Sequence, residues 1–253
     1  MSAVIFEKHD HIAVITLNRP QALNAFNIEL REGLAQAQAQ FAEDDDLWVA
    51  IYTGSGRAFS AGADLKEQSE RLAKGLPPLA TVEGEGQAKQ HWKPTIAAIN
   101  GLAYGRGVSM ALDCDIRIAS TNAVLAITEA RWNLMPMPLP RLAKLIPPSV
   151  AYWMALTAAE LSAQEAYSYG LVVQLARPEE LMDKAMRTAE RICANGPLAV
   201  RETKRFFYAT QSASLDVAQV LASELQNKLR QTEDAVEGPR AFAEKRTPRW
   251  VMR

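Results

Sequence analysis

The chain has 253 residues, of which 48% are hydrophobic and 23% charged, and its formal net charge is -1. This length suits one large α/β domain, or a core with a smaller appendage, and the apolar content is enough for a sizeable core. A balanced charge gives no indication of nucleic-acid binding, which favours a concentrated basic surface. The first residues lack the basic start and apolar block of a signal peptide, and no apolar run reaches the ~20 residues of a membrane span. We therefore expect a cytoplasmic protein that binds neither nucleic acid nor membrane.

The first half of the chain alternates short β-rich runs with helical segments. Residues 3–8 and 12–17 predict a hairpin. Asn27 is placed to cap an amphipathic helix over residues 28–44. Nearly continuous apolar runs, typical of strands buried on both faces, follow at residues 47–54, 95–101, 116–119 and 123–127. Strands alternating with helices favour a mostly parallel inner sheet.

The second half is predicted to be helical. Residues 68–92 are polar and interrupted by Gly and Pro, which indicates a mobile helix or flap beside a site. From about Pro147 onward strands nearly vanish, and periodicity and caps predict helices over residues 149–158, 162–170, 179–195, 197–210 and 214–231. The chain is thus predicted to divide into an α/β core over residues 1–195 and an all-α region over 196–253. Cys114 and Cys193 lack metal-ligand spacing and are expected to be buried free thiols.

Two glycine-rich stretches, residues 52–67 and 100–119, each follow a predicted buried strand. Each can aim backbone N–H groups from a strand-to-helix turn at a common point. Two such donors stabilise a carbonyl oxygen that becomes negative during a reaction, and the positive end of a helix adds to the effect. Either stretch alone is better explained by a tight turn. The pair favours an oxyanion-binding site.

Five motifs carry a resemblance to a known family, and together they run nearly end to end. They are ITLNRPQALNAF, GRAFSAGADLKE, KPTIAAINGLAYGRGVSMALDCDIRIAS, TEARWNL and EDAVEGPRAFAEKR. In this combination the chain resembles the crotonase (enoyl-CoA hydratase/isomerase) superfamily. Its last motif is most similar to the carnitinyl-CoA dehydratase branch, although related tails are widespread in the family.

The resemblance implies a fold, an assembly and a substrate class. The expected fold is a crotonase α/β core, a ClpP-like ββα spiral, with a C-terminal all-α trimerisation region. The expected assembly is a homotrimer or a hexamer made of two trimers. The expected substrate is an acyl-CoA thioester, with coenzyme A present only as part of the substrate and with no metal or redox cofactor.

The resemblance also assigns residues. The oxyanion amides would belong to Ala63 and Arg106. Coenzyme A contacts would come from residues near the first strands, namely Gln21, Ala22, Leu23, Ala61, Asp64, Leu65 and Lys66. Two residues of the tail, Phe242 and Lys245, would contact coenzyme A across a subunit boundary.

The pair of acids that family hydratases use is incomplete here. The first acid would lie three residues beyond the oxyanion amide and the second twenty residues further on. Those positions are Ser109 and Glu129. Glu129 is therefore expected to be the single acid and base. Ser109 cannot replace a carboxylate as a base without an activating partner, and it is expected to line the pocket or to bind a water or a substrate hydroxyl.

Arg106 also departs from the family pattern, because glycine is usual there. Its backbone donor survives, but its side chain must point either outward, toward an acidic partner, or into the acyl pocket, where it would favour an anionic acyl group. At a position with φ > 0 an arginine would be strained and would distort the oxyanion hole. Downstream, Met135 and Met137 lie in a proline-stiffened loop and are suited to an apolar acyl group or to core filling.

Two aspartates near the second glycine-rich stretch are expected to have structural roles. Asp115 would anchor the junction between a helix and a strand, and a buried Asp113 would need a partner such as Arg117. Glu83 and Glu85 in the predicted flap are alternative sources of a second acid.

Three functions stay open at this point. The first is hydratase/isomerase chemistry through an enolate, with double-bond isomerisation easier than two-acid hydration. The second is another crotonase reaction, such as thioester hydrolysis, decarboxylation or dehydration of an unusual acyl group. The third is a non-catalytic acyl-CoA-binding or assembly protein.

Overall fold

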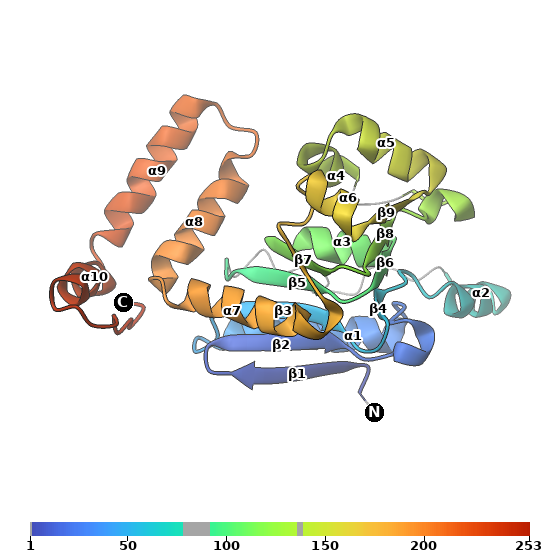
Figure 1. The fold of residues 1–253 in the computed structure, drawn as a ribbon, viewed down its shortest axis with the longest axis horizontal. Helices are drawn as coiled ribbons and strands as arrows, with labels where there is room; N and C mark the ends of the chain where they lie inside the picture. The colour runs from blue at the N-terminus through green and yellow to red at the C-terminus, as the bar shows by residue number, and fades with distance from the viewer. Residues whose placement is uncertain (1, 78–91, 136–138) are drawn as a thin grey trace.

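The computed structural model describes residues 2–77, 92–135 and 139–253. A six-stranded sheet forms the base of the fold in the order β1-β2-β3-β5-β7-β10 (Figure 1). Its strands are β1 (Val4–His9), β2 (Ile12–Leu17), β3 (Val49–Gly54), β5 (Thr95–Ile99), β7 (Ile116–Ser120) and β10 (Gln174–Ala176). β1 and β2 form an antiparallel hairpin, and the pairs from β2 to β10 are parallel. The predicted hairpin and parallel inner sheet are confirmed.

A second, smaller sheet has the order β4-β6-β8-β9. It consists of β4 (Ala58–Ser60), β6 (Leu102–Tyr104), β8 (Val124–Ala126) and β9 (Glu160–Ser162). The first three strands are parallel, and β9 is antiparallel to β8. Of these, only β8 was anticipated, because it lies within the apolar run at residues 123–127. The other three-residue strands are too short to show a periodic pattern.

Alternate residues of the large sheet pack against different helices. Val49 and Ile51 of β3 belong to a cluster that includes α7 (Leu181–Cys193), whereas Ala50 and Tyr52 belong to the cluster that includes α1 (Ile28–Glu43). This follows from the two-residue period of a strand and explains why β3 is apolar throughout. The Asn27 side chain accepts a hydrogen bond from the Leu30 N–H at 2.9 Å, which confirms the predicted cap of α1.

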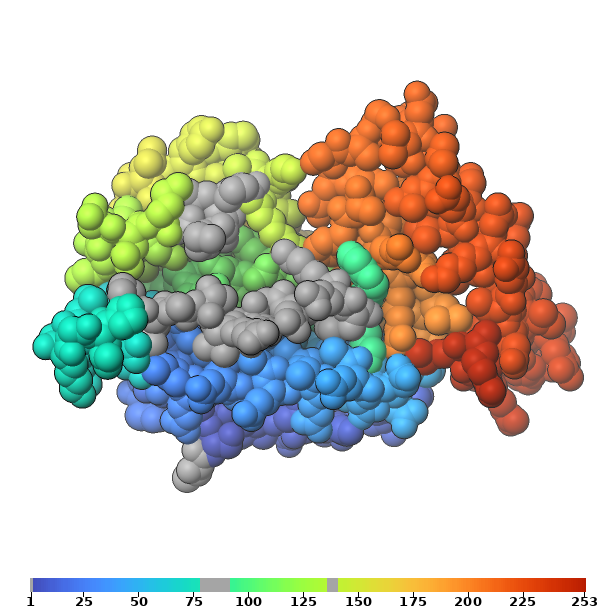
Figure 2. Space-filling view, turned by 180° about the vertical axis from the view of Figure 1, so that it is seen from behind, coloured from blue at the N-terminus to red at the C-terminus, as the bar shows by residue number. Residues whose placement is uncertain are grey.

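The remaining helices divide between the core and the tail. In the core they are η1 (Pro20–Ala22), α2 (Leu65–Ala73), α3 (Arg106–Asp113), η3 (Glu129–Trp132), α4 (Leu139–Leu145), α5 (Pro148–Thr157), α6 (Ala163–Ser168) and η4 (Pro178–Glu180). The tail contains α8 (Pro197–Thr210), α9 (Leu215–Leu229) and α10 (Asp234–Ala243). α9 and α10 project from the core at the end farthest from α2 (Figures 1 and 2). The mixed α/β core with C-terminal helices is confirmed, and the division at residues 195/196 stays a prediction.

No helix in the described ranges is long and apolar enough to cross a membrane. Both cysteines are free thiols, and Cys114 is buried whereas Cys193 is only partly so. The predicted flap lies partly outside the described residues: α2 covers its start, and residues 78–91 are not described.

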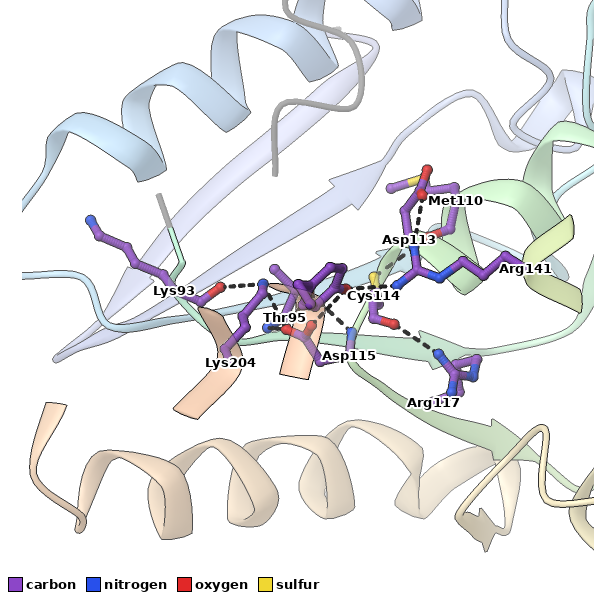
Figure 3. A network of polar contacts seen from close by, with 10 residues as sticks. Lys93, Thr95, Met110, Asp113, Cys114, Asp115, Arg117, Arg141 and Lys204 are labelled. Carbon is purple, nitrogen blue, oxygen red and sulfur yellow. Dashed lines mark hydrogen bonds and ion pairs between the residues drawn. The ribbon is translucent and has the colours of Figure 1, made fainter. Parts of the chain in front are cut away.

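Asp115 joins the tail to the sheet (Figure 3). Its carboxylate lies 2.8 Å from the Lys204 Nζ of α8 and accepts hydrogen bonds from the Tyr208 hydroxyl at 3.0 Å and the Thr95 N–H at 2.8 Å. Lys204 also donates to the carbonyl oxygen of Lys93 at 2.8 Å. Asp115 therefore anchors more than the predicted helix-to-strand junction, because it also ties α8 to the start of β5.

The neighbouring Asp113 does not pair with Arg117 as anticipated. Arg141 of α4 takes that place, with its guanidinium 3.1 Å from the Asp113 carboxylate. Arg117 is buried and donates instead to the carbonyl oxygens of Leu171 and Cys114 at 2.6 Å and 2.7 Å. Asp113 lies at the end of α3 and is partly exposed, so the arginine that it meets depends on how α4 packs rather than on chain proximity.

Replacing Lys204 should destabilise the protein through Asp115. Lys204→Met removes one member of a largely buried pair and leaves Asp115 without its cation, which we expect to lower the free energy of unfolding by about 3 kcal/mol. Arg177→Met is the control, because Arg177 pairs with Glu179 and Glu180 at exposed positions and should cost under about 1 kcal/mol. Urea unfolding measures both. Equal losses in the two variants would contradict the role of the Asp115 pair.

Candidate active site

Three parallel neighbours in the small sheet bring the proposed reacting groups together. Ala63 follows the carboxyl end of β4, Arg106 follows that of β6, and Glu129 follows that of β8. Carboxyl ends of parallel strands meet at the same edge of a sheet, which is where binding sites form in open α/β folds. The pairing of these short strands therefore places the three residues at one edge.

The loops of Ala63 and Arg106 touch at Gly62. Gly62 has a φ of +89°, and a Cβ added to it would lie 2.7 Å from the Tyr104 carbonyl oxygen and 3.2 Å from the Arg106 nitrogen. A side chain would thus clash with the neighbouring backbone. Gly62 allows the two amide-bearing loops to lie side by side.

The direction of the Ala63 amide is set by the peptide before it. The Phe26 N–H donates to the Gly62 carbonyl oxygen at 2.8 Å, so this carbonyl faces Phe26. In a trans peptide the N–H points opposite to the C=O, and the Ala63 N–H therefore points away from Phe26. Within the described part of the chain it donates no hydrogen bond. Arg106 is the first residue of α3, so its amide lies at the positive end of that helix.

The Glu129 carboxylate lies against the turn at Gly105 that precedes α3, which we call the oxyanion turn. A Cβ added to Gly105, which has a φ of +50°, would lie 3.1 Å from the Glu129 Oε1 and 3.3 Å from its Cδ. The Glu129 Oε2 is buried and has no hydrogen-bond partner among the described residues. Desolvation by burial raises the pKa of this carboxyl group above its usual value. A carboxylate with a raised pKa and a buried oxygen without a partner, beside a pair of amides, is typical of a catalytic base.

Ser109 lies one helical turn beyond Gly105 and is 7% exposed. Its hydroxyl donates to the Gly105 carbonyl oxygen at 3.3 Å, within its own helix. A backbone carbonyl cannot act as an activating base, so Ser109 has no general-base capacity.

The side chain of Arg106 lies across an aromatic ring. Its guanidinium carbon is 5.8 Å from the centroid of the fully buried Phe26 ring. The strain anticipated for Arg106 is absent, because the positive φ falls on Gly105 and Arg106 is not among the described non-glycine residues with positive φ. The oxyanion turn therefore keeps an undistorted helix start.

Residues expected to contact coenzyme A surround this edge. Ala61 donates its N–H to the Leu23 carbonyl oxygen at 2.9 Å, which joins the loop after β2 to the loop after β4. Gln21 and Ala22 form η1, Leu65 and Lys66 begin α2, and Asp64 caps that helix by accepting from the Glu67 N–H. The structure brings these residues together with Ala63. Their contact with coenzyme A stays a prediction.

The two tail residues lie elsewhere. Phe242 in α10 is 88% exposed, and Lys245 follows that helix. In the folded molecule α10 lies at the opposite end from α2 (Figure 1). One chain therefore does not bring them to the site. Glu83, Glu85 and Met137 lie outside the described residues, and Met135 is exposed beside η3.

Sequence reasoning missed the polar residues that hold the site together. Arg19 and Asn24 lie within the motif NRPQALNAF, but each also bonds to residues 30 or more positions away, and these distant bonds leave no signal in the motif. A cavity of about 600 Å³ lies at the other end of α3, lined by residues such as Cys114, Lys204 and Tyr208. Ala63, Arg106 and Glu129 do not line this cavity, so it is not the site described here.

The comparisons with known proteins agree with this geometry. The family described as Enoyl-CoA hydratase/isomerase matches residues 7–253. The chain is 39% identical to (E)-benzylidenesuccinyl-CoA hydratase of Thauera aromatica, covering 97% of each protein, and 37% identical to carnitinyl-CoA dehydratase of Salmonella enteritidis PT4, covering 96% and 95%. The crystal structure of enoyl-CoA hydratase from Mycobacterium tuberculosis H37Rv matches with a TM-score of 0.91 and 38% identity over 99% of each chain.

The chain therefore belongs to the enoyl-CoA hydratase/isomerase family, the crotonases. It is an enzyme of the crotonase lyase and isomerase type, and it acts on an acyl-CoA.

The raised pKa of Glu129 has a consequence for stability. Burial disfavours the ionised form in the folded state, so Glu129 destabilises the fold at pH values above its folded pKa and not at pH values below its unfolded pKa. Glu129→Gln should therefore raise the thermal unfolding midpoint at pH 7 by a few degrees, and this gain should shrink in acid. The matched control is Glu224→Gln on the exposed face of α9, which should show no gain. A gain that is the same in acid would contradict the desolvation argument.

Proposed function

We propose that the protein moves a proton along an acyl-CoA through an enolate, with Glu129 as the only carboxylate that the described residues place at the reacting carbons. The observation that carries this proposal is the Glu129 carboxylate over Gly105, whose buried Oε2 has no partner among the described residues, together with serine where a second acid would be. The favoured reaction is isomerisation of an enoyl-CoA double bond, because one carboxylate suffices for it.

In this mechanism the thioester carbonyl oxygen accepts hydrogen bonds from the Ala63 and Arg106 amides. The charge that develops on that oxygen is stabilised by both donors and by the start of α3. Glu129 takes a proton from one carbon, the electron pair of the broken C–H bond enters the enolate, and the protonated Glu129 returns the proton to another carbon. The raised pKa suits both steps, since a group must be a competent base and then a competent acid.

Hydration or dehydration is the second candidate. The relatives at 39% and 37% identity are named a hydratase and a dehydratase, which favours addition or loss of water. With the acids that the described residues supply, Glu129 would have to activate the water and also protonate the carbon. Other crotonase reactions, such as thioester hydrolysis or decarboxylation, and a purely binding role have no specific observation in their favour.

Assays with two enoyl thioesters separate the candidates. A 3-enoyl-CoA gains the conjugated thioester absorbance if it is isomerised, and crotonyl-CoA loses that absorbance if it is hydrated. Glu129→Gln should lower either activity about 10²–10⁴-fold, the usual contribution of a general acid–base group. Ser109→Ala should lower it less than about fivefold, because the serine hydroxyl is bonded within its helix. Retained turnover in Glu129→Gln would rule out the single-acid mechanism, and coenzyme A binding with no turnover would favour the binding role.

We also propose that Arg106 selects an acyl group with a carboxylate. Its side chain starts from the residue whose amide would hold the thioester carbonyl, and it adds a fixed positive charge there. The acyl group named in the benzylidenesuccinyl-CoA relative derives from a dicarboxylic acid, which agrees with this preference.

The preference is measured with crotonyl-CoA and fumaryl-CoA, which differ by a methyl group and a carboxylate at the same carbon. Arg106→Gly should lower the preference for fumaryl-CoA, measured as the ratio of the Kd for crotonyl-CoA to the Kd for fumaryl-CoA, about 10–100-fold, the value of a charged hydrogen bond, and Arg106→Lys should keep most of the ratio. An unchanged ratio in Arg106→Gly would place the side chain outside the acyl pocket.

The proposed assembly is a homotrimer or a pair of trimers. The tail exposes large apolar side chains that a monomer would leave in water, among them Phe207, Leu215, Val220 and Phe242. A neighbouring copy would cover them, and it would also bring Phe242 and Lys245 to a coenzyme A bound on the first copy.

A further inference from the structure

Arg19 closes the loop that carries one proposed oxyanion amide. It lies between β2 and η1, and its side chain is 16% exposed. One guanidinium nitrogen, Nη1, donates to the Ala25 carbonyl oxygen at 2.5 Å and lies 3.0 Å from the Asp64 carboxylate. The loop after β2 and the loop after β4 are thereby held by a single group.

The two acceptors of Arg19, Ala25 and Asp64, flank a bridge of two backbone hydrogen bonds that orients Ala63. Ala25 precedes Phe26, and Asp64 follows Ala63. Between them, the Phe26 N–H donates to the Gly62 carbonyl oxygen at 2.8 Å, and the Asp64 N–H donates to the Phe26 carbonyl oxygen at 3.2 Å. Arg19 therefore spans both ends of the two-bond bridge that points the Ala63 N–H away from Phe26.

Asp64 is fully used in this arrangement. One of its oxygens accepts from the Glu67 N–H and caps α2, and the other faces Arg19. Without Arg19 the second oxygen and the Ala25 carbonyl both lose their donor. The loop would keep its cap and its two backbone hydrogen bonds to Phe26, but it would lose the side-chain connection that supports them.

A separate set of hydrogen bonds supports the fold of the same turn. The buried Asn24 donates to the carbonyl oxygens of Ser55 and Ala58 at 2.9 Å and 2.8 Å, and the Ser60 hydroxyl donates to the Asn24 carbonyl oxygen at 2.8 Å. None of these bonds involves the Arg19 guanidinium. A change at Arg19 should therefore loosen Ala63 while the surrounding turn keeps its shape.

We propose that Arg19 is a positioning residue, which sets the direction of the Ala63 amide toward the thioester oxygen. This inference rests on the proposed oxyanion role of Ala63. Displacing an oxyanion donor by about 1 Å costs on the order of 10²-fold in rate, so the expected loss is large even though Arg19 does not touch the substrate.

The test combines kinetics with the infrared carbonyl stretch of bound butyryl-CoA, a saturated thioester with no double bond to move or hydrate. In the wild type, two aligned amides should lower the stretching frequency relative to the free thioester. Arg19→Ala should lower kcat about 10–100-fold and reduce that frequency shift, with the Kd for butyryl-CoA within about threefold. Arg19→Lys should recover much of both, because an ammonium group also reaches two acceptors.

Two further variants make the test specific. Asp64→Asn keeps an oxygen for the cap of α2 but removes the ion pair, and it should move kcat and the carbonyl shift in the same direction as Arg19→Ala. If Arg19→Ala does not fold, Asp64→Asn and Arg19→Lys still test the proposal. Arg177→Ala is the control, because Arg177 makes only exposed ion pairs with Glu179 and Glu180 and should leave both measurements unchanged.

The outcomes separate this inference from the proposed function. Wild-type kcat in Arg19→Ala, or a lower kcat with the full carbonyl shift, overturns the role of Arg19 alone. A wild-type protein that binds butyryl-CoA without shifting its carbonyl stretch overturns the oxyanion site itself, and the role of Arg19 with it.

Discussion

The parallel pairing of β4, β6 and β8 is the constraint on which this site depends. Each strand has only three residues, and each is followed within three residues by a proposed reacting group: Ala63, Arg106 or Glu129. Pairing aligns the carboxyl ends of the strands, so groups far apart in the chain meet at one edge. The large sheet beneath supplies the buried base from which β3 and β5 deliver their chains to β4 and β6.

Glycines at this edge allow contacts that a side chain would prevent. Gly62 lets one amide-bearing loop meet the other, and Gly105 lets the Glu129 carboxylate rest against the turn. The partly buried Glu129 carboxylate is costly for stability and suitable for chemistry. Such local costs concentrate at functional sites, where the surrounding structure compensates for them. In this fold the compensation comes from the fully buried strands of the large sheet and from bonded polar groups such as Arg19 and Asn24.

Much of the large sheet could be predicted, because its strands are long enough to show apolar runs and α1 carries a recognisable cap at Asn27. The small sheet could not, since β4 and β6 read as glycine-rich loops. The partner of Asp113 was also mispredicted: Arg117 is nearer in the chain, but it is buried and bonded to carbonyl oxygens, and α4 brings Arg141 instead. Partners that depend on how two elements pack cannot be identified from the spacing of residues in one of them.

The sequence by itself determined the family resemblance, the chemistry of the two glycine-rich stretches, and the loss of one acid at Ser109. These follow from residue types at fixed spacing within one segment. Only the tertiary structure decided that the Ala63 amide faces away from Phe26, that the Glu129 carboxylate lies over Gly105 with its Oε2 buried, and that the positive φ falls on Gly105 rather than on Arg106. The physical reason is that direction, burial and pairing are properties of contacts between segments, and such contacts exist only once the strands have paired.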